Sequence, residues 1–311
     1  DIYTLSRPDA LPILTHTLTM SQRLFSSSNC VKIEELCLPY TMPNQWDNLF
    51  KNEGIWNGSF TKLTPDGTEV SDVPSCLTLE RTSKASARFQ VNRYPAGQPP
   101  QETKTEFASI NQSSLFCEDG SFTKGSVQWS PISPFGTEFG LTLPNARLRL
   151  VQLFERGGQL STLVLIREAR DGTSGVACPP LSIDQLLGTW QGQAITYRPD
   201  WSVSSPMATE LSISQPAAHT VMQKWQAGPA TGQSQAKVDG SRLIFEQTGY
   251  QLLFLPNGGS SLCPQTIQRQ TAFRCELGWL IGPDTRLRLT REYQADGSWA
   301  QQTWIKEKKI A

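Results

Sequence analysis

Four arginines are the residues whose type and spacing could recognise an anion. They stand in two Arg-Leu-Arg-Leu runs and are Arg147, Arg149, Arg286 and Arg288. Because side chains alternate between the two faces of a strand, both arginines of a run share one face. If that face points inward, the arginines are buried and need carboxylate partners, which a ligand could supply. We favour the outward arrangement, because the leucines between the arginines form the more natural inner face.

Few other residues could carry catalysis or bind a metal. The chain has two histidines, His16 and His219, too few for histidine-based zinc sites or Ser-His-Asp hydrolysis. Glu138 and Glu276 precede glycines at matched positions, and we expect a turn or an ion pair with a late arginine rather than acid–base work. We therefore assign no catalytic residue and no metal ligand, and we expect a protein that is not an enzyme.

Composition narrows the class of protein further. The 311 residues carry 28 Lys+Arg and 28 Asp+Glu, and this net charge of zero favours neither nucleic acid nor an anionic membrane as partner. The longest apolar runs, such as residues 163–166, are far shorter than a membrane span. Seven cysteines without a CxxC pair indicate a reducing compartment, although Cys263 and Cys275 could form a disulfide across a hairpin.

The chain contains an internal repeat. The pattern Gly-x-Trp-x-Gly at residues 54–58 returns at residues 188–192, and the two Arg-Leu-Arg-Leu runs come after it in the same order. The segments that begin with these runs share seven identities over about 26 positions. We therefore predict two homologous units, residues 42–178 and 179–311, joined by a stretch rich in Gly, Ser and Pro.

Residues 1–41 do not resemble the rest of the chain. Residues 1–13 look like the translation of a sequencing-adapter oligonucleotide, and residues 14–41 have no steady hydrophobic period. We expect a non-native or disordered leader, with the natural chain beginning at Met42 in preference to Met20.

Most of each unit has the alternation of polar and apolar residues that is typical of strands. Residues 147–150 and 162–166 are such runs, and a Gly-containing hairpin turn separates them. Residues 44–52 and 182–187 have features of short helices, and each precedes a Gly-x-Trp strand. The prediction is an all-β fold of two tandem antiparallel up-and-down barrels, each a short N-terminal helix followed by about eight strands.

The Gly-x-Trp motifs, each opening a strand after a short helix, resemble the lipocalin (calycin) signature. In that superfamily the tryptophan closes one end of the barrel and a late-strand arginine packs across its ring. The resemblance implies this role for Trp56 and Trp190, which we expect to pack rather than to touch a ligand.

A narrower resemblance covers residues 42–311. Gln45-Trp46, residues 54–60, Pro65 and residues 72–75 resemble a family of two-barrel proteins from cyanobacteria and plastid-bearing eukaryotes, domain of unknown function 3598. The Arg-Leu-Arg pattern is also similar to that of cyanobacterial chromophore lyases, which seat a bilin in one barrel and attach it to a phycobiliprotein cysteine.

The resemblance implies a binding protein of the cyanobacterial cytoplasm or the plastid stroma. The leading hypothesis is non-enzymatic binding of a small hydrophobic ligand, a tetrapyrrole, carotenoid or fatty acid, in one or both barrels. A bilin is the candidate cofactor. The alternatives are lyase-like attachment of a bilin to phycobiliprotein and a ligand-free interaction module with an exposed apolar patch. The candidate ligand contacts are Trp56, Trp129, Arg147, Arg149, Trp190, Trp279, Arg286 and Arg288.

Overall fold

The computed structural model describes residues 44–84 and 86–310. Residues Thr41–Ala311 group into one compact unit. The predicted leader, residues 1–41, lies outside the described residues, so the expectation about it and about the start of the chain stays a prediction.

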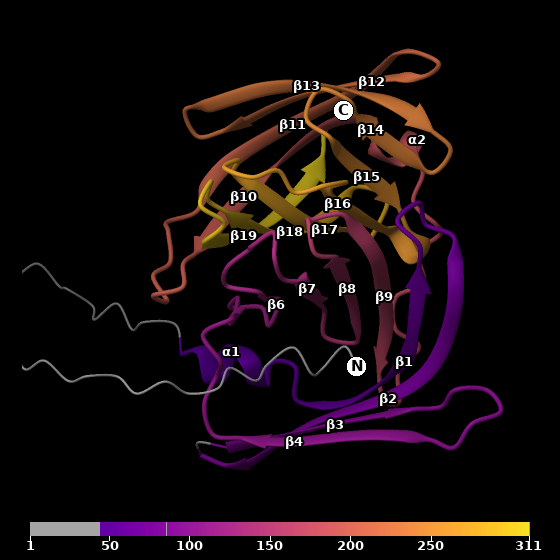
Figure 1. Cartoon of the computed structure of the whole chain (residues 1–311), viewed down its shortest axis with the longest axis vertical. Helices are drawn as coiled ribbons and strands as arrows, with labels where there is room; N and C mark the ends of the chain where they lie inside the picture. The colour runs from indigo at the N-terminus through magenta and orange to yellow at the C-terminus, as the bar shows by residue number, and fades with distance from the viewer. Residues whose placement is uncertain (1–43, 85, 311) are drawn as a thin grey trace, which may run out of the picture. The chain divides into compact units, whose positions relative to one another are not determined.

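The first half of the described chain forms a curled antiparallel sheet after helix α1 (Gln45–Phe50). Nine strands are arranged in the order β4-β3-β2-β1-β9-β8-β7-β6-β5, and β4 does not pair with β5. The strands, indigo to pink in Figure 1, are β1 (Gly54–Leu63), β2 (Glu69–Ser83), β3 (Ser86–Arg93), β4 (Gln101–Phe107), β5 (Ser114–Phe116), β6 (Phe122–Gly125), β7 (Phe135–Thr142), β8 (Ala146–Phe154) and β9 (Leu160–Arg170).

The second half begins with helix α2 (Ile183–Leu186) and forms a closed barrel of ten antiparallel strands in sequence order. A short 3-10 helix, η1 (Pro256–Gly258), separates two of them. The strands are β10 (Gly188–Tyr197), β11 (Met207–Ala217), β12 (Thr220–Ala227), β13 (Ala230–Asp239), β14 (Arg242–Phe245), β15 (Tyr250–Phe254), β16 (Gly259–Pro264), β17 (Phe273–Leu280), β18 (Thr285–Tyr293) and β19 (Trp299–Lys309).

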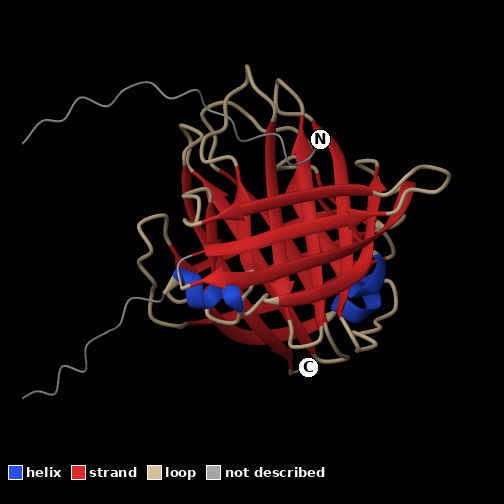
Figure 2. Cartoon of the chain, turned by 90° about the horizontal axis from the view of Figure 1, so that it is seen from below, coloured by secondary structure: helices blue, strands red, loops and turns tan. Residues whose placement is uncertain are grey.

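The predicted fold class is confirmed: both halves are antiparallel β units, and a short helix precedes each of them. Figure 2 shows that strands are the main element of the described chain, with loops and turns between them. The strand numbers are nine and ten where about eight were expected. The halves differ because the chain runs from β4 to β5 without a counterpart of β14, which leaves the first sheet open between these strands. No helix among the described residues is long and apolar enough to cross a membrane.

Helix α1 bridges the opening in the first sheet. The side-chain amide of Gln45 bonds to both backbone groups of Phe116 in β5: its Nε2 donates to the carbonyl at 3.0 Å and its Oε1 accepts from the N–H at 2.8 Å. On the other side of the opening, the Trp46 ring stacks on Phe107 of β4, with ring centroids 5.9 Å apart. The helix therefore pairs with one free edge and covers the other, as a further strand would.

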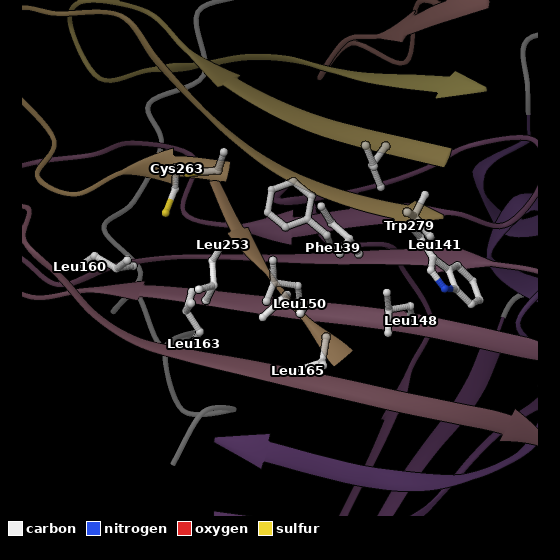
Figure 3. Close-up of a cluster of buried hydrophobic side chains, with 14 of the residues drawn as sticks. Phe139, Leu141, Leu148, Leu150, Leu160, Leu163, Leu165, Leu253, Cys263 and Trp279 are labelled. Carbon is white, nitrogen blue, oxygen red and sulfur yellow. The ribbon is translucent and has the colours of Figure 1, made fainter. Parts of the chain in front are cut away.

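The two halves pack against each other through the leucine faces of β8 and β18. Leu148 and Leu150 are fully buried and belong to a core cluster that also contains Leu253, Cys263 and Trp279 of the second half. Figure 3 shows these side chains pointing toward one another. A second cluster, which includes Leu243 and Leu252, belongs to the second half alone.

The contact between the halves has an approximate two-fold symmetry. Four backbone hydrogen bonds cross it as two equivalent pairs, because each bond made by one half is repeated by the matching residues of the other. One pair is Leu160 N to Gln265 O (3.0 Å) and Trp299 N to Val127 O (2.8 Å), and the other is Ile267 N to Gly158 O (2.9 Å) and Trp129 N to Gly297 O (2.8 Å).

Equivalent polar side chains also reach across this contact. Arg291 of β18 is fully buried and donates from Nη1 to Thr123 Oγ1 at 2.9 Å. Gln152, at the matching position of β8, donates from Nε2 to Ser261 Oγ at 2.8 Å. The Arg291 guanidinium lies 3.5 Å from the centroid of the Trp299 ring, so an aromatic face and hydrogen bonds stabilise its buried charge. Burial lowers the pKa of Arg291.

Candidate functional site

The Gly-x-Trp-x-Gly motif places each tryptophan through two glycines. Gly54 has φ +122° and Gly188 has φ +117°, a backbone region that side chains other than glycine rarely adopt. A Cβ on Gly58 would lie 1.9 Å from the Arg167 carbonyl oxygen, and one on Gly192 would lie 2.2 Å from the Lys306 carbonyl oxygen. Both glycines of the motif are therefore required by geometry, in both halves.

Trp56 lies inside the first sheet with no exposed surface. Its Nε1 donates to the Asn52 carbonyl at 2.9 Å, which fixes the indole after helix α1. The guanidinium carbons of Arg147 and Arg170 lie 4.5 and 4.4 Å from the ring centroid. The packing of an arginine across this ring, which the lipocalin resemblance implied, is therefore present.

Trp190 has the same surroundings in the second half. It is fully buried, and its Nε1 donates to the Leu186 carbonyl of α2 at 2.8 Å. The Arg286 guanidinium carbon lies 4.9 Å from the ring centroid and Lys309 Nζ lies 5.2 Å from it.

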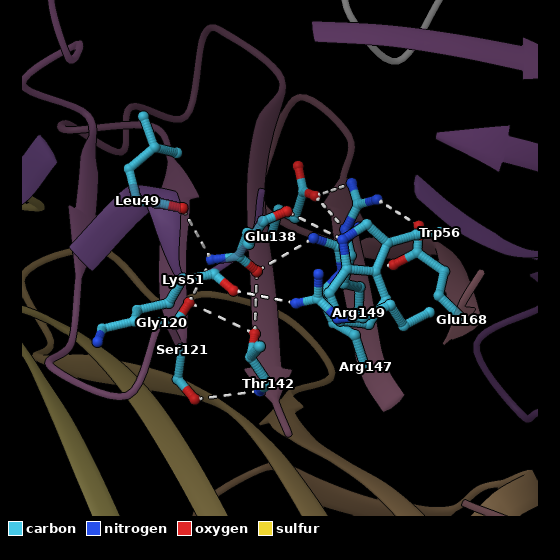
Figure 4. A network of polar contacts seen from close by, with 12 residues as sticks. Leu49, Lys51, Trp56, Gly120, Ser121, Glu138, Thr142, Arg147, Arg149 and Glu168 are labelled. Carbon is cyan, nitrogen blue, oxygen red and sulfur yellow. Dashed lines mark hydrogen bonds and ion pairs between the residues drawn. The ribbon is translucent and has the colours of Figure 1, made fainter. Parts of the chain in front are cut away.

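The arginines of the first half are bound by carboxylates of the chain itself. Arg147 Nε donates to Glu168 at 2.6 Å, and Arg149 Nη1 donates to the second oxygen of Glu168 at 3.2 Å. Arg149 Nε also donates to Glu138 at 2.9 Å. Asn52 completes the network by accepting from Arg147 Nη1 at 3.1 Å. Figure 4 shows the group gathered beside Trp56.

The second half repeats this network. Arg286 Nε donates to Glu307 at 2.5 Å. Arg288 binds Glu276 through two hydrogen bonds, of 2.7 and 2.9 Å, and lies 3.7 Å from the second oxygen of Glu307. Each network therefore contains two arginines and two glutamates, and its net charge is zero.

Electrostatics keep one buried glutamate of each network ionised. Burial alone would raise the pKa of Glu168, but the adjacent Arg147 and Arg149 outweigh it and hold that pKa below its usual value. Arg288 lowers the pKa of Glu276 against the same effect of burial. Since Glu168 and Glu276 stay charged at neutral pH, each neutralises an adjacent arginine without any ligand.

The expectation that these arginines face outward is wrong. Arg147, Arg149 and Arg286 are 3–4% exposed. Both faces of β8 and β18 are buried, because the leucine face packs against the other half of the chain while the arginine face points to the inside of its own sheet. An Arg-Leu alternation cannot distinguish this arrangement from a strand with one solvated face.

The predicted candidate residues separate into three groups. Trp56 lies with Arg147 and Arg149, and Trp190 lies with Arg286 and Arg288 in the equivalent place. Trp129 and Trp279 belong instead to the cluster between the halves, where Trp129 meets the Phe273 ring edge-on and Trp279 Nε1 donates to the Asn257 carbonyl at 3.0 Å. Contact of any of these eight residues with a ligand stays a prediction.

Sequence reasoning did not assign the carboxylates Glu168 and Glu307 to the site. They occupy matched positions in the repeat, and this match was the signal that could have identified them. The expected ion pairs of Glu138 and Glu276 with late arginines are present. Cys263 and Cys275 are buried free thiols rather than a disulfide, and burial raises the pKa of each.

Comparison with known proteins identifies the family. Residues 42–173 match the N-terminal model of a domain of unknown function, DUF3598, and residues 177–310 match the model "Biogenesis factor required for ATP synthase 1, C-terminal domain". A DUF3598-family protein of unknown function from Nostoc punctiforme PCC 73102 has a crystal structure that is 37% identical. It aligns with a TM-score of 0.82 over 86% of this chain and 100% of that one. The chain therefore belongs to the DUF3598 family, as the sequence resemblance predicted.

A more distant likeness concerns an S-type phycobiliprotein lyase from Guillardia theta. It is 11% identical, with a TM-score of 0.33 over 41% of this chain and 89% of that one. This likeness is too weak to support an argument about activity. None of the curated proteins compared with the chain matches it.

Proposed function

We propose that this chain is a non-enzymatic, protein-binding factor that assists the assembly of ATP synthase. The observation that carries the proposal is the match of residues 177–310 to the C-terminal domain of a factor named for ATP synthase biogenesis. The proposal includes two domains, residues 42–178 and 179–311, and a location in the cyanobacterial cytoplasm or the plastid stroma.

The geometry of the arginines supports this proposal over catalysis. Each of the four arginines of the Arg-Leu-Arg-Leu runs is bound by a glutamate of the chain. Networks that are buried and neutral offer no free charge to a reacting group. Exposed aromatic rings, such as those of Trp201 and Trp225, are then available to a partner.

A second candidate function is binding of a small apolar ligand, a tetrapyrrole, carotenoid or fatty acid, inside the first sheet. The observation that favours it is the partly exposed inner face of that sheet, where Val73 and Phe122 are only half-buried. Attachment of a bilin to phycobiliprotein would need, in addition, a reactive group that we do not identify.

Deletion of the gene in its own host tests the assembly proposal. The expected result is a lower amount of assembled ATP synthase on native gels, with free subunits accumulating, and recovery when the wild-type gene is restored. A double variant, Trp201→Ser with Trp225→Ser, is expected to restore assembly poorly, while Ile132→Ser on the first half serves as the matched exposed control. An unchanged level of assembled enzyme after deletion would refute the proposal.

A further inference from the structure

Three further cations lie on the inner face of the first sheet. The pairing register places Arg93 opposite Ser75, and Ser75 opposite Gly58 between Trp56 and Phe60. Since residues directly opposite each other share a face, Arg93 shares the face of the tryptophan. By the same rule Lys62, opposite Val164, and Lys124, opposite Glu138, lie on this face. We call Lys62, Arg93 and Lys124 the inner cations.

The inner cations have no counter-ion within residues 44–84 and 86–310. No ion pair or side-chain hydrogen bond in that part of the chain involves them. Arg93 Nε is buried and without a partner, and so is the hydroxyl of Ser75, a residue that is only 5% exposed. Buried donors without partners cost free energy, and an incoming acceptor would remove that cost.

The carboxylates of the same face are already engaged. Glu138 accepts from Arg149, and Glu168 accepts from Arg147 and Arg149. Neither can neutralise the inner cations without releasing an arginine. The inner face of the first sheet therefore has a surplus of positive charge that the rest of the face does not balance.

The second half lacks this surplus. Its register places Thr196, Ala227 and Leu262 at the positions that correspond to Lys62, Arg93 and Lys124. The Arg–Glu networks are repeated in both halves, whereas the inner cations occur only in the first. Because the networks are repeated in both halves, they are consistent with a structural role. Because the inner cations occur in one half and lack counter-ions, they are consistent with a binding site for an anion.

We propose that the inner face of the first sheet binds a small amphipathic carboxylate, with the carboxylate held by Arg93 and Ser75. This rests on the second candidate function and names its site and ligand chemistry. A guanidinium and a hydroxyl can together satisfy both carboxylate oxygens, while Lys62 and Lys124 attract the anion. Phe60 and Val91, buried on the same face, contact its apolar part. A fatty acid and a tetrapyrrole both carry the required carboxylate, and a hydrocarbon carotenoid does not.

Titration of the purified chain with oleate, oleyl alcohol and biliverdin, followed by tryptophan fluorescence, tests the proposal. We expect oleate or biliverdin to bind at least about tenfold more tightly than oleyl alcohol, with binding that weakens as salt is added. Which of the two carboxylates binds more tightly distinguishes the fatty acid from the tetrapyrrole. Binding of neither carboxylate, or equal binding of oleate and its alcohol, would overturn the proposal.

Variants of strand β3 supply the matched control. Arg93→Gln on the inner face should weaken carboxylate binding at least about tenfold. Arg88→Gln, on the outer face of the same strand where Arg88 pairs with Glu80 and Glu106, should leave it unchanged. If Arg93→Gln does not fold, Lys124→Gln is tested and should weaken binding less. Equal affinity for the carboxylate in wild type and in a folded Arg93→Gln variant would contradict the proposal. Whether this variant restores ATP synthase assembly in the deletion strain reports separately on the assembly function.

Discussion

Substitution of Glu168 by Gln would test whether the inward arginines are structural. Glu168 contacts both Arg147 and Arg149, at 2.6 and 3.2 Å, and its side chain is fully buried. After Glu168→Gln, Arg149 keeps Glu138, but Arg147 keeps no carboxylate contact among the described residues and retains the amide oxygen of Asn52 at 3.1 Å and the face of the Trp56 ring. The variant therefore leaves one buried guanidinium without a counter-ion.

The expected cost arises from that unpaired charge. Breaking a buried ion pair by removing one partner costs about 3–5 kcal/mol, a large part of the roughly 5–15 kcal/mol of a typical domain. Glu80→Gln is the matched control, because Glu80 is 47% exposed and pairs with a half-exposed Arg88. An exposed pair contributes about 0–1 kcal/mol. Urea denaturation of both variants should separate them by about 3 kcal/mol in the free energy of unfolding.

The reasoning would be refuted if Glu168→Gln lost no more stability than Glu80→Gln. That result would mean that water or another group compensates Arg147, so that the arginine is available to a ligand after all. Glu307→Gln provides the repeat of the experiment in the second half, where Arg286 depends on this carboxylate.

Three further predictions concern the pH dependence, the motif glycines and the contact between halves. In the folded chain the pKa values of Glu168 and Glu276 lie below their usual 4.5. As the pH falls, these carboxylates are therefore protonated in the unfolded chain before they are protonated in the folded chain. Their contribution to stability is present above about pH 4.5 and is lost as the pH falls through the folded pKa values. In an acid titration, the free energy of unfolding of Glu276→Gln should therefore decline less steeply than that of the wild type. Gly58→Ala should cost more than about 2 kcal/mol in thermal or urea unfolding, whereas Gly282→Ala, where a Cβ meets nothing within 4 Å, should cost under about 0.5 kcal/mol. Arg291→Gln should speed hydrogen exchange in β6 by at least about tenfold, because Arg291 donates to Thr123, and unchanged exchange there would contradict this role.

The motifs of the sequence predicted the fold class. They also identified the arginines and the tryptophan of each site, but they did not assign Glu168 and Glu307 to it. Gly54 has a backbone conformation that other residues rarely adopt, and Gly58 has no room for a Cβ. The motif alone therefore predicts the local structure around the tryptophan. The Arg-Leu-Arg-Leu runs indicated the strands and the pairing of residues on each face. The repeat matched Glu168 with Glu307, although the chemistry of that match became clear only from their contacts with the arginines.

Two features depend on tertiary packing and could not be predicted locally. Which face of β8 points inward depends on the other half of the chain, since Leu148 is buried in a cluster that also contains Leu253 and Trp279 of the second half. The role of helix α1 is similar: Gln45 bonds to the edge of β5 because the sheet lacks a strand there, and nothing in the helix sequence indicates this.

Native mass spectrometry of the purified chain, mixed with the separated subunits of ATP synthase and with the assembled enzyme, tests the proposed assembly role most directly. The proposal predicts a stoichiometric complex with at least one free subunit and none with the assembled enzyme, because an assembly factor must leave its product. The absence of a complex with every free subunit, at concentrations of tens of micromolar (a free energy weaker than about −6 to −7 kcal/mol), would contradict it.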